Sequence, residues 1–276
     1  MVVFPNCKIN LGLHILNKRE DGYHNIETVF YPVPLKDALE IIPSDKAEII
    51  QFTSSGLIIS GDAATNLCSK AYHLLKKDYP ILPNVKMHLH KVIPVGAGLG
   101  GGSSDAAFTL QLLNNRFKLN LSTTQLIDYS LQLGSDCPFF ILNEPCIATG
   151  RGEIMEKVKL DLSAYQLMLV NPGIHVNTAE AFGLLASQKI DDSSVSLKNI
   201  ITKPVNTWQH FLTNHFETVL ANKYPVIKEI KETLYAIGAS YAAMSGSGST
   251  VYGLFKKELR PVVNFDPLFF VRLNSL

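Results

Sequence analysis

Long hydrophobic runs are absent from this sequence. No stretch of about 18 consecutive apolar residues occurs in the chain, so we expect no membrane-spanning helix and no membrane partner. The opening residues, MVVFPN, lack the basic region and the long apolar run of a signal peptide. They also show no sign of a transit peptide, and we therefore expect a cytoplasmic protein.

Cysteine is scarce, and neither sign of charge is in excess. The 276 residues include four cysteines, with no CxxC pair and no histidine and cysteine cluster at zinc spacing. We predict reduced thiols, as in cytosolic proteins. With 25 basic and 24 acidic residues the net charge is +1, which provides no basic surplus for nucleic acid. We expect no nucleic-acid partner.

The composition that remains is that of an ordinary globular protein. A hydrophobic content of 46% and a charged content of 18% exclude a disordered chain, a collagen and a coiled coil. Helices and strands are predicted to mix without regular alternation, which favours an α+β fold in two parts. The buried strand in AYQLMLVNPG begins the second part, so we predict domains at residues 1–160 and 161–276.

Apolar periodicity predicts where most elements lie. Residues 7–15 alternate between apolar and polar, which predicts a half-buried strand with Lys8 and Asn10 on its polar face. Other strands are predicted at residues 37–43, 56–60, 85–95, 139–142, 148–157 and 269–273 and on both sides of a glycine loop at residues 245–249. Helices are predicted at residues 66–79, 122–134, 177–188, 208–221 and 225–237, and another after a glycine run, capped by Ser103 or Ser104.

Glycine is concentrated in that run, VGAGLGGGSSDAA, which holds five glycines between Gly96 and Gly102. A flexible linker would not need a strand directly before it and a helix start directly after it. Glycines let backbone N–H groups approach an anion, and the N-terminus of the following helix is electropositive. The run therefore predicts a phosphate-binding loop.

Three better-known glycine loops do not fit. Gly96, Gly98 and Gly101 match the dinucleotide pattern GxGxxG, but the segment NNRFKLNLS after the helix offers no carboxylate for a ribose. The preceding strand also alternates, unlike a buried parallel strand. A P-loop would need a lysine after the glycines, and a protein kinase would need downstream HRD and DFG motifs. A nicotinamide oxidoreductase is thus disfavoured.

Three ordered motifs resemble those of the GHMP kinases, a family of small-molecule kinases. They are CKINLGLHI near the N-terminus, PVGAGLGGGSSDAA at residues 94–107 and AMSGSGSTVYGLF at residues 243–255. The resemblance implies a two-domain GHMP kinase fold, with a ribosomal-S5-like N-terminal domain that has an unusual left-handed crossover and a ferredoxin-like C-terminal domain. It also implies ATP as phosphate donor, accompanied by Mg²⁺. Ala97 departs from the glycine that many relatives have, and residues 256–276 match no part of the pattern.

Three details resemble one branch of that family, whose members act on cytidine diphosphate methylerythritol. They are KINL from Lys8, DGYH at residues 21–24 and GSDCPFF at residues 134–140. The resemblance implies phosphorylation of the 2-hydroxyl of 4-diphosphocytidyl-2-C-methyl-D-erythritol in non-mevalonate isoprenoid biosynthesis. Another GHMP kinase with a different substrate and a non-catalytic, S5-like RNA-binding module remain as alternatives. The oligomeric state, monomer or homodimer, stays open.

The resemblance implies two catalytic residues. Asp136 is expected to accept the proton of the substrate hydroxyl, and Lys8 to hold Asp136 ionised and to contact the transferring phosphoryl group. From the residues alone, Asp136 is equally well a turn or capping aspartate before Cys137 and Pro138. Lys8 alone is equally well a solvated lysine on a strand.

The resemblance also implies the nucleotide site. The residues expected to bind ATP are Pro94, Val95, Gly96, Ala97, Gly98, Leu99, Gly100, Gly101, Gly102, Ser103, Ser104, Asn66 and Lys91. Asn66 and Lys91 are as easily surface residues. No carboxylate is a convincing ligand for Mg²⁺, so the metal ligands are left open, with Ser104 or water as candidates.

For the substrate, the resemblance implies that Tyr23 stacks on cytosine, that His24 pairs with its polar edge and that Phe182 covers its second face. The full set of expected substrate-binding residues is Asn10, Tyr23, His24, Thr178, Phe182, Gly246 and Gly248. Other interpretations stay open: Phe182 also suits a helix core, Gly246 and Gly248 a hairpin turn, and Asn10 an edge-strand or turn asparagine.

Overall fold

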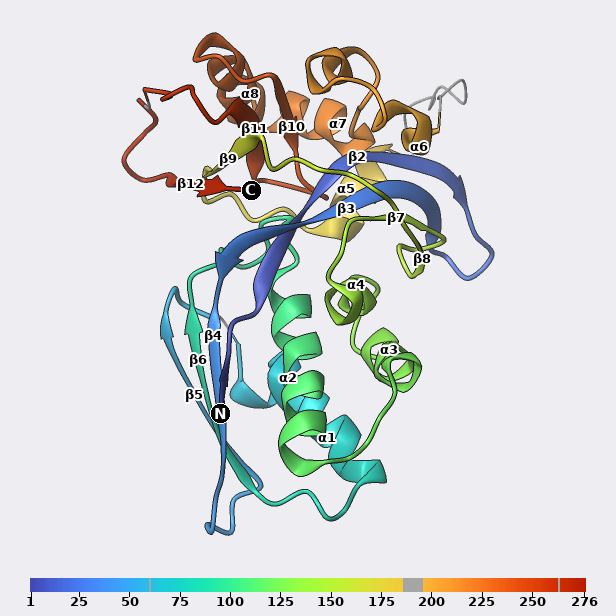
Figure 1. Cartoon of the computed structure of the whole chain (residues 1–276), viewed down its shortest axis with the longest axis vertical. Helices are drawn as coiled ribbons and strands as arrows, with labels where there is room; N and C mark the ends of the chain where they lie inside the picture. Colours follow the sequence, from blue (N-terminus) through green and yellow to red (C-terminus); the bar gives the residue numbers. More distant parts are fainter. Residues whose placement is uncertain (60, 186–195, 263) are drawn as a thin grey trace. The chain divides into compact units, whose positions relative to one another are not determined.

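The computed structural model describes residues 1–59, 61–185, 196–262 and 264–276. They form two compact units (Figure 1). The first consists of Met1–Cys7, Leu35–Val95 and Gly100–Glu144, and the second of Lys8–Pro34, Gly96–Leu99 and Pro145–Leu276. Each unit is described by itself.

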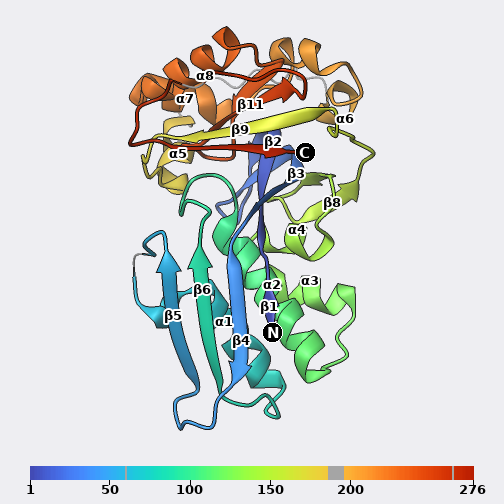
Figure 2. The ribbon, with the colours of Figure 1, turned by 60° about the vertical axis from the view of Figure 1, so that its left-hand side comes forward.

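The first unit is built on a mixed four-stranded sheet in the order β1-β4-β6-β5. Its strands are β1 (Val2–Val3), β4 (Ala38–Pro43), β5 (Ile50–Gly56) and β6 (Val85–Lys91). β4 runs antiparallel to β1 and β6, whereas β5 and β6 are parallel. Strict alternation of buried and exposed residues along β6 leaves one face of the sheet to the helices (Figure 2).

Four helices pack in the first unit: α1 (Leu67–Asp78), α2 (Gly101–Phe117), α3 (Thr123–Leu131) and α4 (Cys137–Leu142), with a 3₁₀ turn η1 (Ala63–Thr65) before α1. Asn66 caps α1 by accepting a hydrogen bond from the Cys68 N–H. Ser122 and Gln125 form a capping box at α3. The buried side of α2 holds Ala106, Ala107, Leu110 and Leu113, as the periodicity predicts.

Three local predictions in this unit are wrong. The strand predicted at residues 139–142 is helical, because these residues form the end of α4, whose first turn carries Pro138. The cap of α2 is Gly100 in the left-handed conformation, not Ser103 or Ser104, because the helix already begins inside the glycine run at Gly101. The strand predicted at residues 56–60 ends at Gly56 instead. The φ of Gly56 is +79°, and a Cβ there would lie 2.2 Å from the Lys91 carbonyl oxygen, so the chain turns away and leaves Ile58 exposed.

The first sheet of the second unit has the order β2-β3-β7-β8. Its strands are β2 (Asn6–Lys18), β3 (His24–Lys36), β7 (Cys146–Thr149) and β8 (Ile154–Lys157), of which β2 and β3 begin or end in the first unit. The prediction that β2 is half buried is wrong. Every residue from Asn6 to Ile15 is buried, so the polar residues Lys8, Asn10 and His14 lie in the interior.

The second sheet of this unit is antiparallel, in the order β10-β11-β9-β12. Its strands are β9 (Tyr165–Asn171), β10 (Tyr241–Met244), β11 (Val251–Lys256) and β12 (Phe270–Ser275). The accompanying helices are α5 (Thr178–Leu185), α6 (Leu197–Ile200), α7 (His215–Lys223), α8 (Val226–Ala236) and the 3₁₀ turn η2 (Val205–His210). The helix predicted at residues 208–221 is therefore split, since Asn214 caps a new helix. The end of the helix predicted at residues 177–188 lies outside the described residues.

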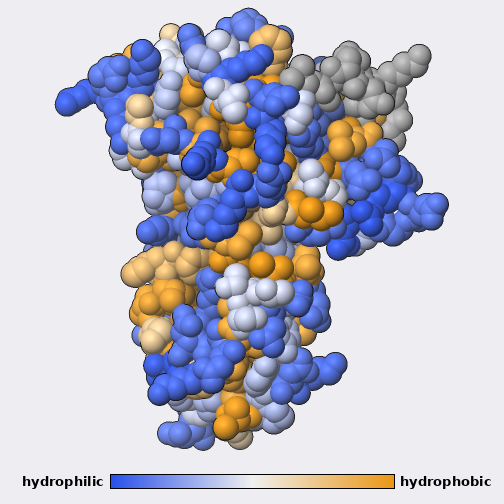
Figure 3. Space-filling view, turned by 45° about the vertical axis from the view of Figure 1, so that its right-hand side comes forward, coloured by the Kyte–Doolittle hydropathy of each residue, from blue (hydrophilic) through white to orange (hydrophobic). Residues whose placement is uncertain are grey.

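One apolar cluster of the second unit joins both of its sheets to α5, α7 and α8, through residues such as Leu13, Val170, Leu220 and Leu234. Exposed apolar side chains include Ile81 and Leu268, and the face in Figure 3 shows hydrophilic surface with apolar patches within it. No helix within the described ranges is long and apolar enough to cross a membrane. The division at residue 160 and the hand of the β5-α1-β6 crossover stay predictions.

A reciprocal amide pair supports the end of α4. The side chains of Asn6 and Asn143 hydrogen-bond each other at 3.1 and 2.9 Å, and the φ of Asn143 is +53°. Asn143→Gly removes the amide but permits this φ, whereas Asn143→Ala also strains the backbone. We expect Asn143→Ala to lower the free energy of unfolding by about 1 kcal/mol more than Asn143→Gly in urea denaturation. Equal losses would contradict a backbone role for this position.

Candidate active site

Lys8 is buried in β2, with 3% of its surface exposed. Its ammonium donates a hydrogen bond to Asn10 Oδ1 at 2.5 Å and lies 4.9 Å from the ring centre of Phe30. The alternative of a solvated strand lysine is therefore wrong. A buried ammonium needs polar or anionic partners, which makes Lys8 suitable for holding a negative group.

Asn10 connects β2 to both glycine loops. Its backbone N–H donates to Ser245 Oγ at 3.1 Å, and Ser245 Oγ donates to the Gly98 carbonyl at 2.9 Å. Its side-chain amide donates to Thr28 Oγ1 at 2.9 Å. Asn10 is thus an interior residue whose side chain and backbone are fixed, and the edge-strand alternative does not apply.

The two glycine loops approach each other at the backbone level. A Cβ on Gly98 would lie 2.0 Å from the Ser245 carbonyl oxygen, and a Cβ on Gly246 would lie 3.1 Å from the Gly98 carbonyl oxygen. The N–H of Lys8 donates to the Leu99 carbonyl at 3.0 Å. Gly96, Gly98 and Gly246 all have positive φ, so only glycine fits both the space and the conformation. The structure therefore brings Lys8 and Asn10 next to residues 96–99 and 245–249.

The residues predicted to hold cytosine lie at the start of β3 and on α5. Tyr23 is 54% exposed, and the Arg151 guanidinium lies 4.7 Å from its ring centre. His24 stacks on Phe182 with a centroid distance of 4.4 Å, so one face of Phe182 is already covered. Partial burial, and then Lys18, lower the pKa of His24 and keep its imidazole neutral at pH 7.

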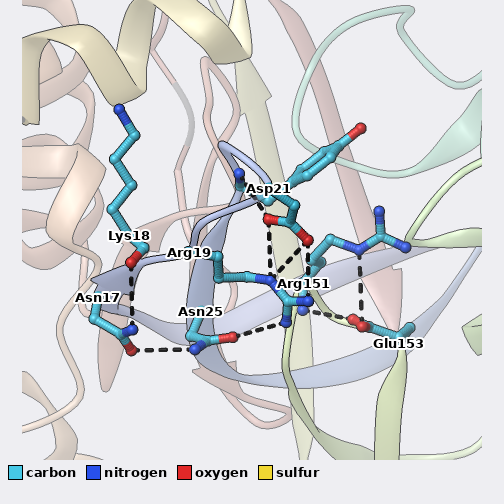
Figure 4. Close-up of polar contacts among 8 residues, drawn as sticks. Asn17, Lys18, Arg19, Asp21, Asn25, Arg151 and Glu153 are labelled. Carbon is cyan, nitrogen blue, oxygen red and sulfur yellow. Dashed lines mark hydrogen bonds and ion pairs between the residues drawn. The ribbon is translucent and has the colours of Figure 1, made fainter.

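Thr178 links α5 to the second glycine loop, because its Oγ1 lies 3.0 Å from Ser247 Oγ. The turn before Tyr23 is held by its own polar network, which Figure 4 shows. Arg19 donates to both carboxylate oxygens of Asp21 and to Asn25 Oδ1, and Asp21 accepts from the Tyr23 N–H. These contacts fix the backbone that presents Tyr23 and His24.

Asp136, in the first unit, occupies the N-cap position of α4, but its side chain makes no capping hydrogen bond. Asp136 lies in the turn before Cys137 and Pro138, so its catalytic role stays a prediction beside the alternative of a turn aspartate. The neighbouring Cys137 thiol hydrogen-bonds Ser103 in α2, while burial raises its pKa to about 12 and keeps it a neutral thiol. A Cβ on Gly134 would lie 3.4 Å from Cys137 Sγ and 4.0 Å from Ser103 Oγ. The turn that carries Asp136 thus packs against the first turn of α2.

Ser104 is fully buried in that first turn, and its Oγ finds no hydrogen-bond partner among the described residues. An unpartnered buried hydroxyl at a helix N-terminus suits a phosphate oxygen or a hard cation. No group of three or more acidic, histidine or cysteine side chains is arranged to hold a metal within the part of the chain that is described. Among the described residues, the Ser104 hydroxyl is thus a side chain that would suit Mg²⁺, with water or phosphate oxygens as further ligands.

Lys91 belongs to a buried ion triad. Its ammonium lies 2.5 Å from Asp37 and 2.6 Å from Asp105, and all three side chains are nearly inaccessible. The second oxygen of Asp37 accepts the N–H groups of Val92 and Ile93. Lys91 is thus no surface residue. The triad joins the end of β6, before the glycine run, to α2, after it, and Asn66 is occupied in capping α1.

Sequence reasoning missed Asp37, Thr28, Ser245, Asp105 and Arg151. Asp105 carried a usable signal, because it lies beside Ala106 and Ala107 on the apolar side of α2, where a carboxylate needs a buried partner. The others lie in segments whose partners are distant in the chain, so no local pattern reveals them.

Comparison with known proteins assigns the family. Residues 66–144 match the family model of the GHMP kinases N terminal domain, and residues 197–262 match that of the GHMP kinases C terminal domain. A protein from Bacteroides fragilis named 4-diphosphocytidyl-2-C-methyl-D-erythritol kinase is 53% identical over 94% of this chain and 93% of its own length. The chain belongs to the GHMP kinase family. It is a small-molecule kinase, and this family uses ATP as phosphate donor.

Solved structures agree with this assignment. A crystal structure of 4-(cytidine 5'-diphospho)-2C-methyl-D-erythritol kinase has a TM-score of 0.79 and 30% identity, with 92% of this chain and 90% of that chain covered. A mevalonate kinase structure has a TM-score of 0.72 at 14% identity, with coverage of 94% and 92%, and this likeness concerns the fold alone. The predicted two-domain α+β GHMP kinase fold is confirmed.

The ion triad predicts a pH dependence of stability. Burial raises the pKa of Asp105 to about 7, although Lys91 opposes the shift and Asp37 adds to it. A carboxyl group with a raised pKa binds its proton more tightly in the folded state, so stability falls as the pH rises from about 4 to about 7 and then levels off.

Asp105→Asn should remove that slope. We expect the wild type to lose about 1 kcal/mol or more of unfolding free energy relative to the variant over this pH window, measured by urea denaturation at several pH values. Parallel pH curves for the two proteins would show that Asp105 is already ionised in the folded state at low pH.

Proposed function

We propose that this kinase transfers the γ-phosphoryl group of ATP to the 2-hydroxyl of 4-diphosphocytidyl-2-C-methyl-D-erythritol. The observation that carries the proposal is the buried Lys8–Asn10 pair, hydrogen-bonded into both glycine loops. It occurs in a chain 53% identical to a curated kinase named for this substrate. The same fold in mevalonate kinase does not favour another acceptor, because that identity is 14%.

In the proposed reaction, Asp136 and Lys8 have different roles in phosphoryl transfer. Asp136 accepts the proton of the attacking hydroxyl, and Lys8 supplies a positive charge that keeps Asp136 ionised and stabilises the transferring group. The burial of Lys8 supports a cation that acts in a low-dielectric surrounding.

For ATP we propose the glycine run and the start of α2, residues 94–104, with Lys91 acting chiefly through its ion triad. The N-terminal end of α2 and the run of backbone N–H groups suit the triphosphate. Mg²⁺ would be held by Ser104, water and phosphate oxygens and would neutralise charge on the transferring group.

The proposed cellular site is the cytoplasm, which suits the free state of all four cysteines. Monomer or homodimer, and no nucleic-acid partner, remain our predictions.

For the cytidyl group we propose Tyr23 as the stacking surface and the neutral His24 as the edge partner. Neutral imidazole offers one donor and one acceptor, which suits the edge of a neutral base. Because His24 already stacks on Phe182, Phe182 supports His24 unless the substrate moves that ring. Asn10, Thr178, Gly246 and Gly248 complete the proposed substrate side.

The direct test is release of ADP from Mg-ATP with the cytidyl substrate. Asp136→Asn should lower kcat by about a thousandfold or more, because the carboxylate can no longer accept the proton and loses its charge. The melting temperature should stay close to that of the wild type. No turnover by the wild type, or full turnover by Asp136→Asn, would refute the proposal.

A matched control is Asp128→Asn on α3, where an exposed aspartate is converted to the same amide. We expect its kcat and melting temperature to equal those of the wild type. A comparable loss in this variant would show that the assay responds to surface charge and not to the proposed base.

Ser104 allows a separate test of the nucleotide side. Ser104→Ala removes a buried hydroxyl that has no partner in the described part of the chain, so folding should lose little. We expect the KM for Mg-ATP to rise about tenfold, with a higher Mg²⁺ requirement and an unchanged KM for the cytidyl substrate. The control is Ser130→Ala, a buried serine whose hydroxyl is satisfied by the Ile127 carbonyl. Identical kinetics for both variants would remove Ser104 from the site.

A further inference from the structure

The proposed substrate contains a diphosphate, and none of the residues expected to bind the substrate carries a cation for it. An anion of this kind is recognised by groups that offer charge and several N–H donors, above all by arginine. We therefore expect a basic side chain near Tyr23 and His24 that can bind the diphosphate. The described residues around these two include Arg19, Lys18 and Arg151.

The Arg19 guanidinium already has hydrogen-bond partners within its own turn. Its Nε donates to both carboxylate oxygens of Asp21, and its Nη1 donates to Asn25 Oδ1. Figure 4 shows the contacts of this guanidinium with Asp21 and Asn25, while the Lys18 ammonium points away from them. Arg19 is consequently a structural group of the turn.

Arg151 is differently placed. It lies in the β7–β8 turn between Gly150 and Gly152, both of which have positive φ, and its backbone N–H donates to Glu153. The Gly150 carbonyl accepts the N–H of Ile26, two residues after His24, at 2.7 Å. The turn is thus fastened to β3 directly beside the predicted cytidyl surface.

The Arg151 side chain covers one face of Tyr23, with the guanidinium 4.7 Å from the ring centre. Its Nε forms an ion pair of 3.7 Å with Glu153, which is longer than a hydrogen bond. Its side chain is 31% exposed. Within the described residues its guanidinium has no hydrogen-bond partner, so its N–H donors remain available to an anion.

We propose that Arg151 binds the diphosphate of the cytidyl substrate while it covers one face of Tyr23, which directs cytosine to the opposite face. This inference rests on the proposed function and extends it. One residue then links the base-stacking surface to recognition of the phosphates, and a cytidine without phosphates gains only from the stacking.

The test compares cytidine with cytidine diphosphate as ligands in calorimetry or competition against the substrate. In Arg151→Gln we expect the dissociation constant of cytidine diphosphate to rise about tenfold and that of cytidine by less than about twofold. The KM for ATP should not change. Arg151→Lys, which keeps the charge but not the planar fork, should give an intermediate value for cytidine diphosphate.

Arg272→Gln is the matched control, since Arg272 lies 5.0 Å from the Phe270 ring centre on β12 in the same kind of contact. It should bind both ligands like the wild type. Equal weakening of cytidine and cytidine diphosphate in Arg151→Gln would overturn the inference and reduce Arg151 to a support for Tyr23. No weakening of either ligand would overturn it as well.

Turnover by the wild type separates this inference from the proposed function. If the wild type phosphorylates the cytidyl substrate but binds cytidine diphosphate no more tightly than cytidine, only the inference fails. If the wild type does not phosphorylate that substrate, the proposed function fails, and the role of Arg151 fails with it.

Discussion

The contact between Gly98 and Ser245 is the constraint on which the arrangement of β2 and the two glycine loops depends. The backbones approach so closely that a Cβ on Gly98 would lie 2.0 Å from the Ser245 carbonyl oxygen. Ser245 Oγ bridges the same place, because it accepts from the Asn10 N–H and donates to the Gly98 carbonyl. Two loops separated by almost 150 residues are therefore held as one surface, and β2 is held against it. A side chain at Gly98 would therefore push apart the two glycine loops and β2 at the same time.

This constraint explains why β2 is buried on both faces. Alternation of apolar and polar residues along a strand ordinarily indicates that one of its faces is exposed to solvent. In β2 the polar residues are used internally: Asn10 hydrogen-bonds Thr28 and Ser245, and Lys8 hydrogen-bonds Asn10. The polar side of the strand therefore faces the glycine loops and not water. Internal hydrogen bonding to neighbouring segments is thus a second reason for alternation besides exposure.

The sequence predicts well what local chemistry determines. Periodicity finds β6, α1 and α8, and the motif order predicts the fold, which the family comparison confirms. Prediction from the sequence fails where residues far apart in the chain determine the local structure. β5 ends at Gly56, because the chain there passes close to the Lys91 carbonyl with a positive φ. The helix α2 begins within the glycine run, at Gly101. The partners of Lys91 and the cover of Tyr23 by Arg151 come from segments far along the chain, which no local pattern reveals.

Polar groups without partners mark the start of α2. Within the described residues, the buried side-chain atoms that lack a hydrogen bond belong to His14, Ser104, Asp105, Arg116 and Asn274. Two of these five, Ser104 and Asp105, are consecutive and follow the glycine run after Ser103. A buried polar atom left unpaired costs about 1–3 kcal/mol, so folding alone would not favour two neighbours of this kind. Under the proposed function, the Ser104 hydroxyl would find its partner on a phosphate oxygen or on Mg²⁺, and the Lys91–Asp105 ion pair holds the helix start to β6. The start of α2 thus combines unpaired polar atoms with the Lys91–Asp105 ion pair that fastens it to β6.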